Sequence, residues 1–245
     1  MATAKKTENI VEIKPIVKKT VKVRIVGDSP LIMHAWDAKA KREILEKEIG
    51  AKKVKVREPK NPIADFVASM YWLTPCPEEM TAEAVGEAIR NGARFGFPCT
   101  SFKQAGISAA YRLGWAKDKM SLRGVFNIVP DADGFYGGDL EIDWDKKAVK
   151  VVPNQFKPYS LVEIHSDPPS MREDAVKVGM GAADLRYRGE FENWWADLTV
   201  EYDENGPYSL DDIVNIINAG GFYCGVGDWR TERDGTNGAY HVEIK

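Results

Sequence analysis

The segment from residue 195 to the end constrains the fold most, because it gives a strand, a helix and further strands in succession. Apolar and polar residues alternate in WADLTVEY (195–202), the period-two pattern of a half-buried strand. Ser209 and Asp212 then have capping-box spacing ahead of an apolar helix face, which Gly220-Gly221 is expected to end. A short strand, a glycine-rich loop and a final strand follow. Such elements around a small antiparallel sheet predict an α+β fold with a ferredoxin-like or RNA-recognition-type core.

The earlier part of the chain adds a strand and three helices. VKVRIV at 21–26 alternates in the same way, and the glycine, aspartate and proline after it stop the strand. Apolar residues at helical spacing predict helices over 37–50 and 81–92, and a third that begins within 96–104 and ends at Gly114.

The remaining segments define the domain organisation. Residues 1–20, with five lysines against two glutamates, read as a flexible basic tail. Residues 21–245 then form a single domain. The chain changes character between about 124 and 170, where residues 139–152 predict a β-hairpin that turns at 145–147. We expect this segment to be an inserted, projecting arm.

Composition excludes several classes of protein. No segment approaches the roughly 20 apolar residues that cross a bilayer, and the N-terminus lacks the apolar run of a secretory signal. Three widely spaced cysteines favour free thiols in a reducing compartment. The three histidines stand apart, without the short paired spacing of zinc ligands. We therefore expect a cytoplasmic protein, in the host cytoplasm if it is viral, with no membrane partner, metal or cofactor.

Positive charge is concentrated locally, although the net charge is −3. KKVKVREPK at 52–60 contains Lys53, Lys55 and Arg57 among five basic residues and one acid. A run of this kind is either a solvated loop or a surface that attracts phosphate groups. Both interpretations stay open from the sequence.

A second candidate lies at the start of the third helix, in PCTSFK at 98–103. The hydroxyl of Thr100 or Ser101 is able to cap the helix, which leaves Lys103 unexplained. A helix N-terminus carries free N–H groups and partial positive charge, so Ser101 and Lys103 beside it would favour a bound phosphate. The alternative is an ordinary capped helix with an exposed lysine.

The third candidate is the glycine-rich stretch GVGDWRTERDGTNGAY at 225–240. Arg230 and Arg233 are candidates for phosphate contacts, and Trp229 for stacking on a base. The order of its glycines matches neither a dinucleotide fingerprint nor a phosphate loop. The alternative is a glycine-rich hairpin whose tryptophan packs internally.

Two further features have weaker functional interpretations. His34, after the first strand, would act as a general acid or base, although the sequence shows no positioned partner and a structural role is the alternative. Trp194 and Trp195 follow Arg186 and Arg188, which fits a nucleic-acid surface, a core or a subunit contact.

These stretches together resemble the RAMP superfamily, the backbone subunits of CRISPR effector complexes and their relatives. GDSPLIMH (27–34) is similar to the family's first strand and its exit, GFPCTSFKQAGISAAYR (96–112) to its helix entry, and GVGDWRTERDGTNGAY (225–240) to its C-terminal glycine-rich loop. The three occur in the family's order and together span about a sixth of the chain. The chain also resembles bacteriophage-encoded proteins.

The resemblance implies roles for particular residues. Ser101 and Lys103 match the helix-entry serine and lysine that contact the backbone of guide RNA in that family. Residues 131–152 would correspond to the arm that separates or kinks bases in those subunits. Cys99 and Gln104 stand where the family has glycines, and the aspartate with which some members cleave RNA is not identifiable. The resemblance thus implies binding without cleavage.

The sequence as a whole predicts a non-enzymatic protein that binds RNA or single-stranded DNA through backbone phosphates. We expect it to form a homo-oligomer or a larger ribonucleoprotein along the strand. One alternative is a metal-independent ribonuclease that uses His34. Another is a viral structural or interaction protein without nucleic-acid binding, in which Trp194, Trp195 and the hairpin make subunit contacts.

Overall fold

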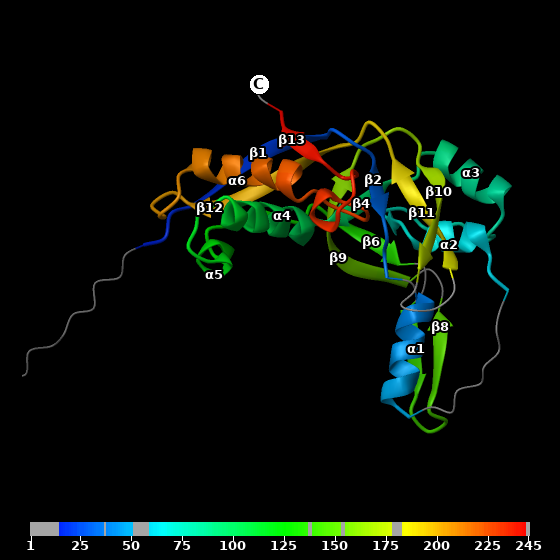
Figure 1. The fold of residues 1–245 in the computed structure, drawn as a ribbon. Coiled ribbons are helices and arrows are strands. Elements are labelled where there is room, and N and C mark those ends of the chain that lie inside the picture. Colours follow the sequence, from blue (N-terminus) through cyan, green and yellow to red (C-terminus); the bar gives the residue numbers. More distant parts are fainter. Residues whose placement is uncertain are drawn as a thin grey trace, which may run out of the picture.

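The computed structural model describes residues 15–36, 38–50, 59–136, 139–152, 155–177 and 183–243. Within them the protein is α+β, with antiparallel sheets and six α-helices (Figure 1). In chain order the elements are β1 (Lys18–Gly27), β2 (Leu31–Met33), α1 (Ala38–Glu48), α2 (Pro62–Ala68), β3 (Tyr71–Trp72), α3 (Ala82–Arg90), β4 (Phe95–Pro98), α4 (Cys99–Arg112), α5 (Lys119–Arg123), β5 (Phe126–Val129), β6 (Ala132–Tyr136), β7 (Asp139–Asp143), β8 (Ala148–Val152), β9 (Gln155–Ile164), β10 (Ser170–Lys177), β11 (Ala183–Phe191), β12 (Trp195–Asp203), α6 (Leu210–Tyr223), the 3₁₀ turn η1 (Thr231–Arg233) and β13 (Tyr240–Val242).

Four strands form the main sheet in the order β13-β1-β12-β5, and each neighbouring pair is antiparallel. Helices α4 and α6 cover one face of this sheet (Figure 1). The register places Val23 opposite Leu198 and Ile25 opposite Ala196, and all of these side chains are buried in the core. The strand predicted at 195–202 is confirmed as β12, and its alternation arises because one face of the sheet is buried.

Glycines allow α4 and α6 to approach each other closely. A Cβ atom added to Gly220 would lie 2.6 Å from the backbone nitrogen of Gly106, and one added to Gly221 would overlap the carbonyl of Tyr240. The prediction that Gly220-Gly221 ends the helix is therefore wrong, since α6 continues to Tyr223 and occupies the predicted short strand. These glycines serve close packing, and their backbone stays helical.

The rest of the body is a second group of strands. β3, β4, β9 and β6 close into a small barrel, while β10, β11 and β2 form a three-stranded sheet. The ring centroids of Phe95 on β4 and Phe191 on β11 lie 5.3 Å apart. One hydrophobic core therefore extends from the main sheet into this second group of strands.

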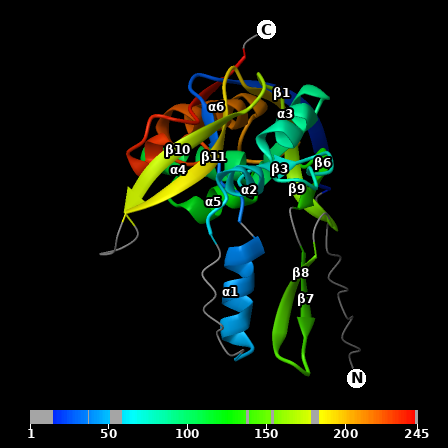
Figure 2. The ribbon, with the colours of Figure 1, turned by 90° about the vertical axis from the view of Figure 1, so that its right-hand side faces the viewer.

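An arm projects from the body (Figures 1 and 2). It consists of the β7–β8 hairpin and of α1, which packs against it from a distant part of the sequence. The predicted hairpin is confirmed, with its turn between Asp143 and Ala148. The predicted insertion at about 124–170 is broader than the projecting part, because β5, β6 and β9 within it belong to the sheets of the body.

Several local predictions are confirmed by the helix ends. The Thr81 side chain caps α3, and Ser209 and Asp212 form the expected capping box at the start of α6.

β1 begins at Lys18, three residues before the predicted strand, because Lys18 pairs with Asp203 in the sheet register. The three cysteines are buried thiols that form no disulfide with one another. In the described part of the chain, no helix has the length and apolar character needed to span a membrane.

Candidate nucleic-acid interface

Backbone hydrogen bonds join the glycine-rich loop to the exit of the first strand. Asp28 N donates to Ala239 O at 2.8 Å, and Gly238 N donates to Pro30 O at 2.8 Å. The amide of Asp228 donates to Ile32 O at 2.9 Å. Two segments about two hundred residues apart in the sequence are thereby held side by side.

Trp194 connects these two segments to α4. Its side chain is fully buried, and its indole N–H donates to Ser29 O at 2.8 Å. The Trp194 ring centroid lies 6.5 Å from that of Phe102 on α4 and 6.1 Å from that of Tyr240 on β13. Each of the three motif segments therefore contacts the same tryptophan. Because it is buried, Trp194 is not available for the predicted subunit contact.

No side chain of the described residues caps the start of α4. Its N-cap residue is Pro98, so the expected capping by Thr100 or Ser101 is not observed. Thr100 is exposed, Ser101 is half-buried, and the neighbouring Cys99 is buried. A helix of fourteen residues thus presents its first N–H groups without a capping side chain from the described residues, beside the two hydroxyls.

Lys103 lies close to the start of α4, against the edge strand β5. Its Nζ donates to Asn127 Oδ1 at 2.7 Å and lies 5.8 Å from the centroid of the Phe126 ring. Partial burial lowers the pKa of Lys103. An ammonium group has three donor hydrogens, so this tethered lysine retains donors for an anion.

The two arginines of the glycine-rich loop, Arg230 and Arg233, differ in their contacts. Arg230 donates to Glu232 Oε2 at 3.3 and 3.2 Å and to Gly227 O at 3.1 Å, while Arg112 at the end of α4 holds the other oxygen of Glu232 at 2.9 Å. The guanidinium of Arg230 is therefore held by hydrogen bonds to the loop itself. Arg233 is exposed, and the structure gives its side chain no hydrogen bond or ion pair among the described residues.

Trp229 is the exposed aromatic residue of this loop. Its side chain is 42% exposed, and its backbone has a φ of 52°. Trp229 O accepts from Asn237 N at 3.0 Å, which fixes the turn that carries the indole. The internal packing considered as the alternative is therefore incomplete, and part of the ring faces solvent.

His34 has a partner that the sequence did not reveal. Its Nδ1 lies 2.8 Å from Asp228 Oδ2, and the Nε of Arg188 lies 3.0 Å from the same oxygen. Burial acts to raise the pKa of Asp228, but the hydrogen bond from His34 and the charges of His34 and Arg188 outweigh it and lower that pKa. A charged Asp228 orients the imidazole, whose side chain is 43% exposed.

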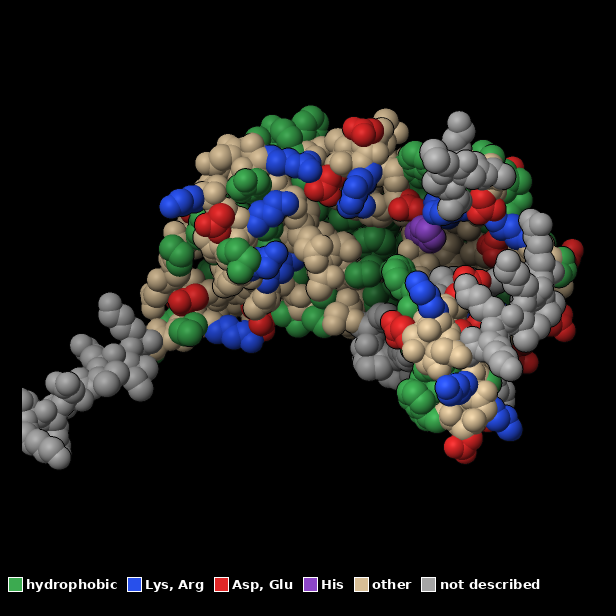
Figure 3. Space-filling view, turned by 60° about the horizontal axis from the view of Figure 1, so that its bottom comes forward, with side chains coloured by type: hydrophobic (Ala, Val, Ile, Leu, Met, Phe, Trp, Pro, Cys, Tyr) green, Lys and Arg blue, Asp and Glu red, His purple; other side chains and the backbone are tan. Residues whose placement is uncertain are grey.

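The predicted residues form two groups. Ser101 and Lys103 lie together at the start of α4, and Trp229, Arg230 and Arg233 lie together on the loop. No hydrogen bond or ion pair among the described residues joins the two groups directly, although Trp194 links their supporting segments. Lys53, Lys55 and Arg57 lie outside the described residues, as does Asp37, the first residue of the helix predicted over 37–50. On the face shown in Figure 3, Lys and Arg side chains are scattered among acidic and apolar ones.

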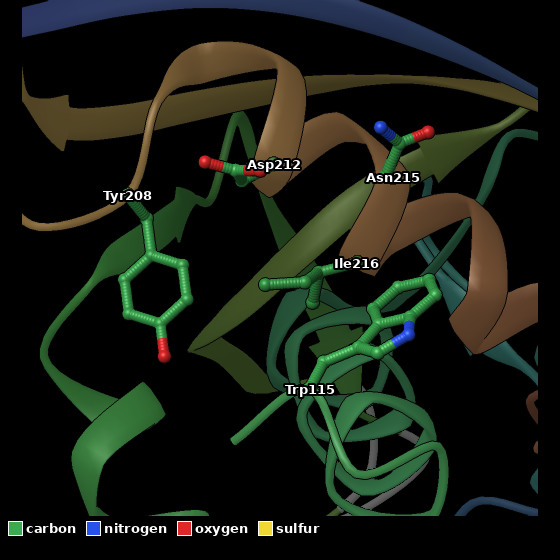
Figure 4. Close-up of a pocket in the computed structure, with 5 residues that line it drawn as sticks. All are labelled: Trp115, Tyr208, Asp212, Asn215 and Ile216. Atoms are coloured by element: carbon green, nitrogen blue, oxygen red, sulfur yellow. The ribbon is translucent and has the colours of Figure 1, made fainter.

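A hollow of about 410 Å³ lies beside α6, away from both groups (Figure 4). Trp115 and Tyr208 stand on two sides of it and Ile216 points between them, while Asp212 and Asn215 complete the lining. None of these described lining residues is a lysine or an arginine. A polyanion would meet no opposite charge from them, so this hollow is not part of the candidate interface.

No protein-family model and no curated protein sequence matches the chain. The family resemblance of the three motif segments therefore rests on their residues and on their order. What the geometry adds is their spatial convergence on Trp194.

Proposed function

We propose that this protein is a RAMP-like, non-enzymatic binder of RNA or single-stranded DNA, and that several copies assemble side by side along the strand. The observation that carries the proposal is the meeting of three motif segments around Trp194. Segments that resemble one family in sequence order also form one contiguous unit of the fold. Such convergence is expected when they build one binding surface.

The order of the elements supports a ferredoxin-like core. Strands and helices of the main sheet follow one another as β1-α4-β5-β12-α6-β13, with β1 and β12 at the centre. This is the β-α-β-β-α-β pattern of that fold, interrupted by the barrel, the arm and the three-stranded sheet. Fold alone does not assign function, so the site residues carry the rest of the proposal.

In this proposal, two groups of residues hold the nucleic acid. Ser101, Lys103 and the first N–H groups of α4 contact phosphate oxygens, as does Arg233 on the loop. Trp229 stacks on a base, and Arg230 keeps the loop in shape through Glu232. Contacts to the backbone carry no base information, so binding tolerates many sequences.

Lys103→Ala and Arg233→Ala should each weaken binding of a labelled oligouridylate or oligothymidylate by about tenfold, the effect of one charge-assisted hydrogen bond. Each variant should also flatten the dependence of affinity on salt, because fewer counterions are released. Fluorescence anisotropy measures both quantities. Arg90→Ala, an exposed arginine on α3, is the matched control and should leave affinity unchanged. If Lys103→Ala and Arg233→Ala bind as tightly as the control, Lys103 and Arg233 do not contact phosphate groups.

The contact between His34 and Asp228 favours one second candidate, a metal-independent ribonuclease. With Nδ1 held by Asp228, the other ring nitrogen is able to take the proton of a ribose 2′-hydroxyl. The 2′-oxygen then attacks the adjacent phosphorus, and the 5′-oxygen leaves with a proton from solvent. The products are a 2′,3′-cyclic phosphate and a 5′-hydroxyl.

His34→Ala should reduce such cleavage by at least about 100-fold, the usual contribution of a general base. Labelled RNA is incubated with both proteins in chelator, and the same strand with 2′-deoxyribose serves as the uncleavable control. Equal cleavage by wild type and His34→Ala, or none by either, rules out this candidate. Either outcome leaves the binding proposal intact.

A further inference from the structure

Trp195 forms the centre of a three-layer stack on the side of the main sheet opposite α4 and α6. The His165 ring lies 4.0 Å from the Trp195 ring, with an interplanar angle of 15°. The guanidinium carbon of Arg24 lies 4.1 Å from the centroid of the Trp195 ring. Arg24 comes from β1 on one side of β12, and His165 pairs with Trp195 on the other side. The indole is therefore held between them.

Each layer of this stack is fixed by further contacts. Arg24 donates to both oxygens of Asp197 at 2.7 and 2.8 Å. The backbones of His165 and Trp195 exchange two hydrogen bonds of 3.0 and 2.8 Å. His165 is nevertheless exposed. These contacts hold Arg24 and Trp195 in place, while His165 at one end of the stack is exposed to solvent.

His165 is one of the residues that line a cavity of about 240 Å³. The cavity is smaller than the roughly 300–1,000 Å³ of a typical small-molecule site, so it fits a fragment such as one planar base. Its lining is apolar at Phe95 and Ile164, with polar groups from Arg94, Ser166 and Asp167. Arg94 is paired through two hydrogen bonds with Glu163, so the cavity offers no net positive charge for a phosphate.

We propose that His165, supported by Trp195 and Arg24, is a stacking site for one unpaired base of a bound nucleic-acid strand. Stacking needs a flat, exposed π-face and tolerates any base. Arg94, Ser166 and Asp167 line the same cavity as His165, and in this proposal they contact the edge of that base. This inference rests on the proposed function and adds to it a base contact on the sheet, separate from the phosphate contacts.

The test compares His165→Ala with His165→Phe in anisotropy titrations with a labelled oligouridylate. His165→Ala should bind about tenfold more weakly, as expected for the loss of one stacked base. His165→Phe retains a flat ring and should stay within about twofold of wild type. His241→Ala is the control. His241 is also exposed, but it is paired with Asp28 at 2.7 Å, and its removal should leave the affinity unchanged.

Photocrosslinking of wild type to an oligonucleotide with 5-iodouracil gives a second readout that does not depend on variant stability. The crosslinked peptide should contain His165. Equal affinities of wild type and His165→Ala, with crosslinks elsewhere, overturn the stacking site and leave the proposed function standing. A wild type that binds no oligonucleotide overturns both.

Discussion

Trp194→Ala lowers the free energy of unfolding by about 3–5 kcal/mol, the range for removal of a large buried aromatic side chain. The indole is fully buried against Phe102 and Tyr240, and its N–H bond to Ser29 O is lost with it. A natural domain has only about 5–15 kcal/mol of stability in total. The variant is therefore close to unfolding, and urea denaturation followed by far-ultraviolet circular dichroism measures the loss.

Two further variants serve as comparisons for the stability of Trp194→Ala. Trp144→Ala removes a tryptophan that is 70% exposed at the tip of the arm, and should change stability by no more than about 0.5 kcal/mol. Trp194→Phe keeps an aromatic ring at the site and should lie between wild type and alanine. A loss below about 1 kcal/mol for Trp194→Ala would contradict the convergence of the motif segments on this residue.

Gly238→Ala is expected to cost about 2–5 kcal/mol, for two additive reasons. Gly238 has a φ of 66°, and a side chain in that conformation costs roughly 1–2 kcal/mol. A Cβ there would also overlap the carbonyl oxygen of Val226, and overpacking typically costs about 1–3 kcal/mol. Relief of the overlap would break the bonds of Gly238 to Pro30 and Val226 that hold the loop against the first strand.

Gly92→Ala separates the two causes. Gly92 has a φ of 88°, but a Cβ there would meet nothing within 4 Å. It should lose only the conformational part, roughly 1–2 kcal/mol, in the same denaturation experiment. If Gly238→Ala is no more destabilised than Gly92→Ala, the close approach of the loop to Val226 is not a constraint on the native state.

Local patterns in the sequence predicted the local elements well. The alternation at 195–202, the Thr81 cap and the capping box at Ser209 each depend on neighbours within a few residues, and the structure confirms them. The predicted end of α6 is wrong because a glycine pair occurs both at helix ends and where another backbone packs closely against a helix. Gly220 and Gly221 serve contacts with α4 and β13, and only tertiary structure distinguishes these from a helix end.

The same limit applies to the candidate site. His34 and Asp228 are 194 positions apart, so no local pattern connects them. For the two tryptophans a signal was present: Ala196, Leu198 and Val200 face the core, so continuing the alternation places Trp194 inside and Trp195 on the other face. For Arg230, the glutamate two positions later indicated an internal partner.

The most direct test of the central claim is the affinity of the wild-type protein for single-stranded RNA and DNA at a series of salt concentrations. The account predicts binding to at least one of them, with the logarithm of the affinity falling linearly with the logarithm of the salt concentration, by about 0.7 per neutralised phosphate. An absence of binding to both strands at about 50 mM salt, where such electrostatic binding is strong, would contradict it.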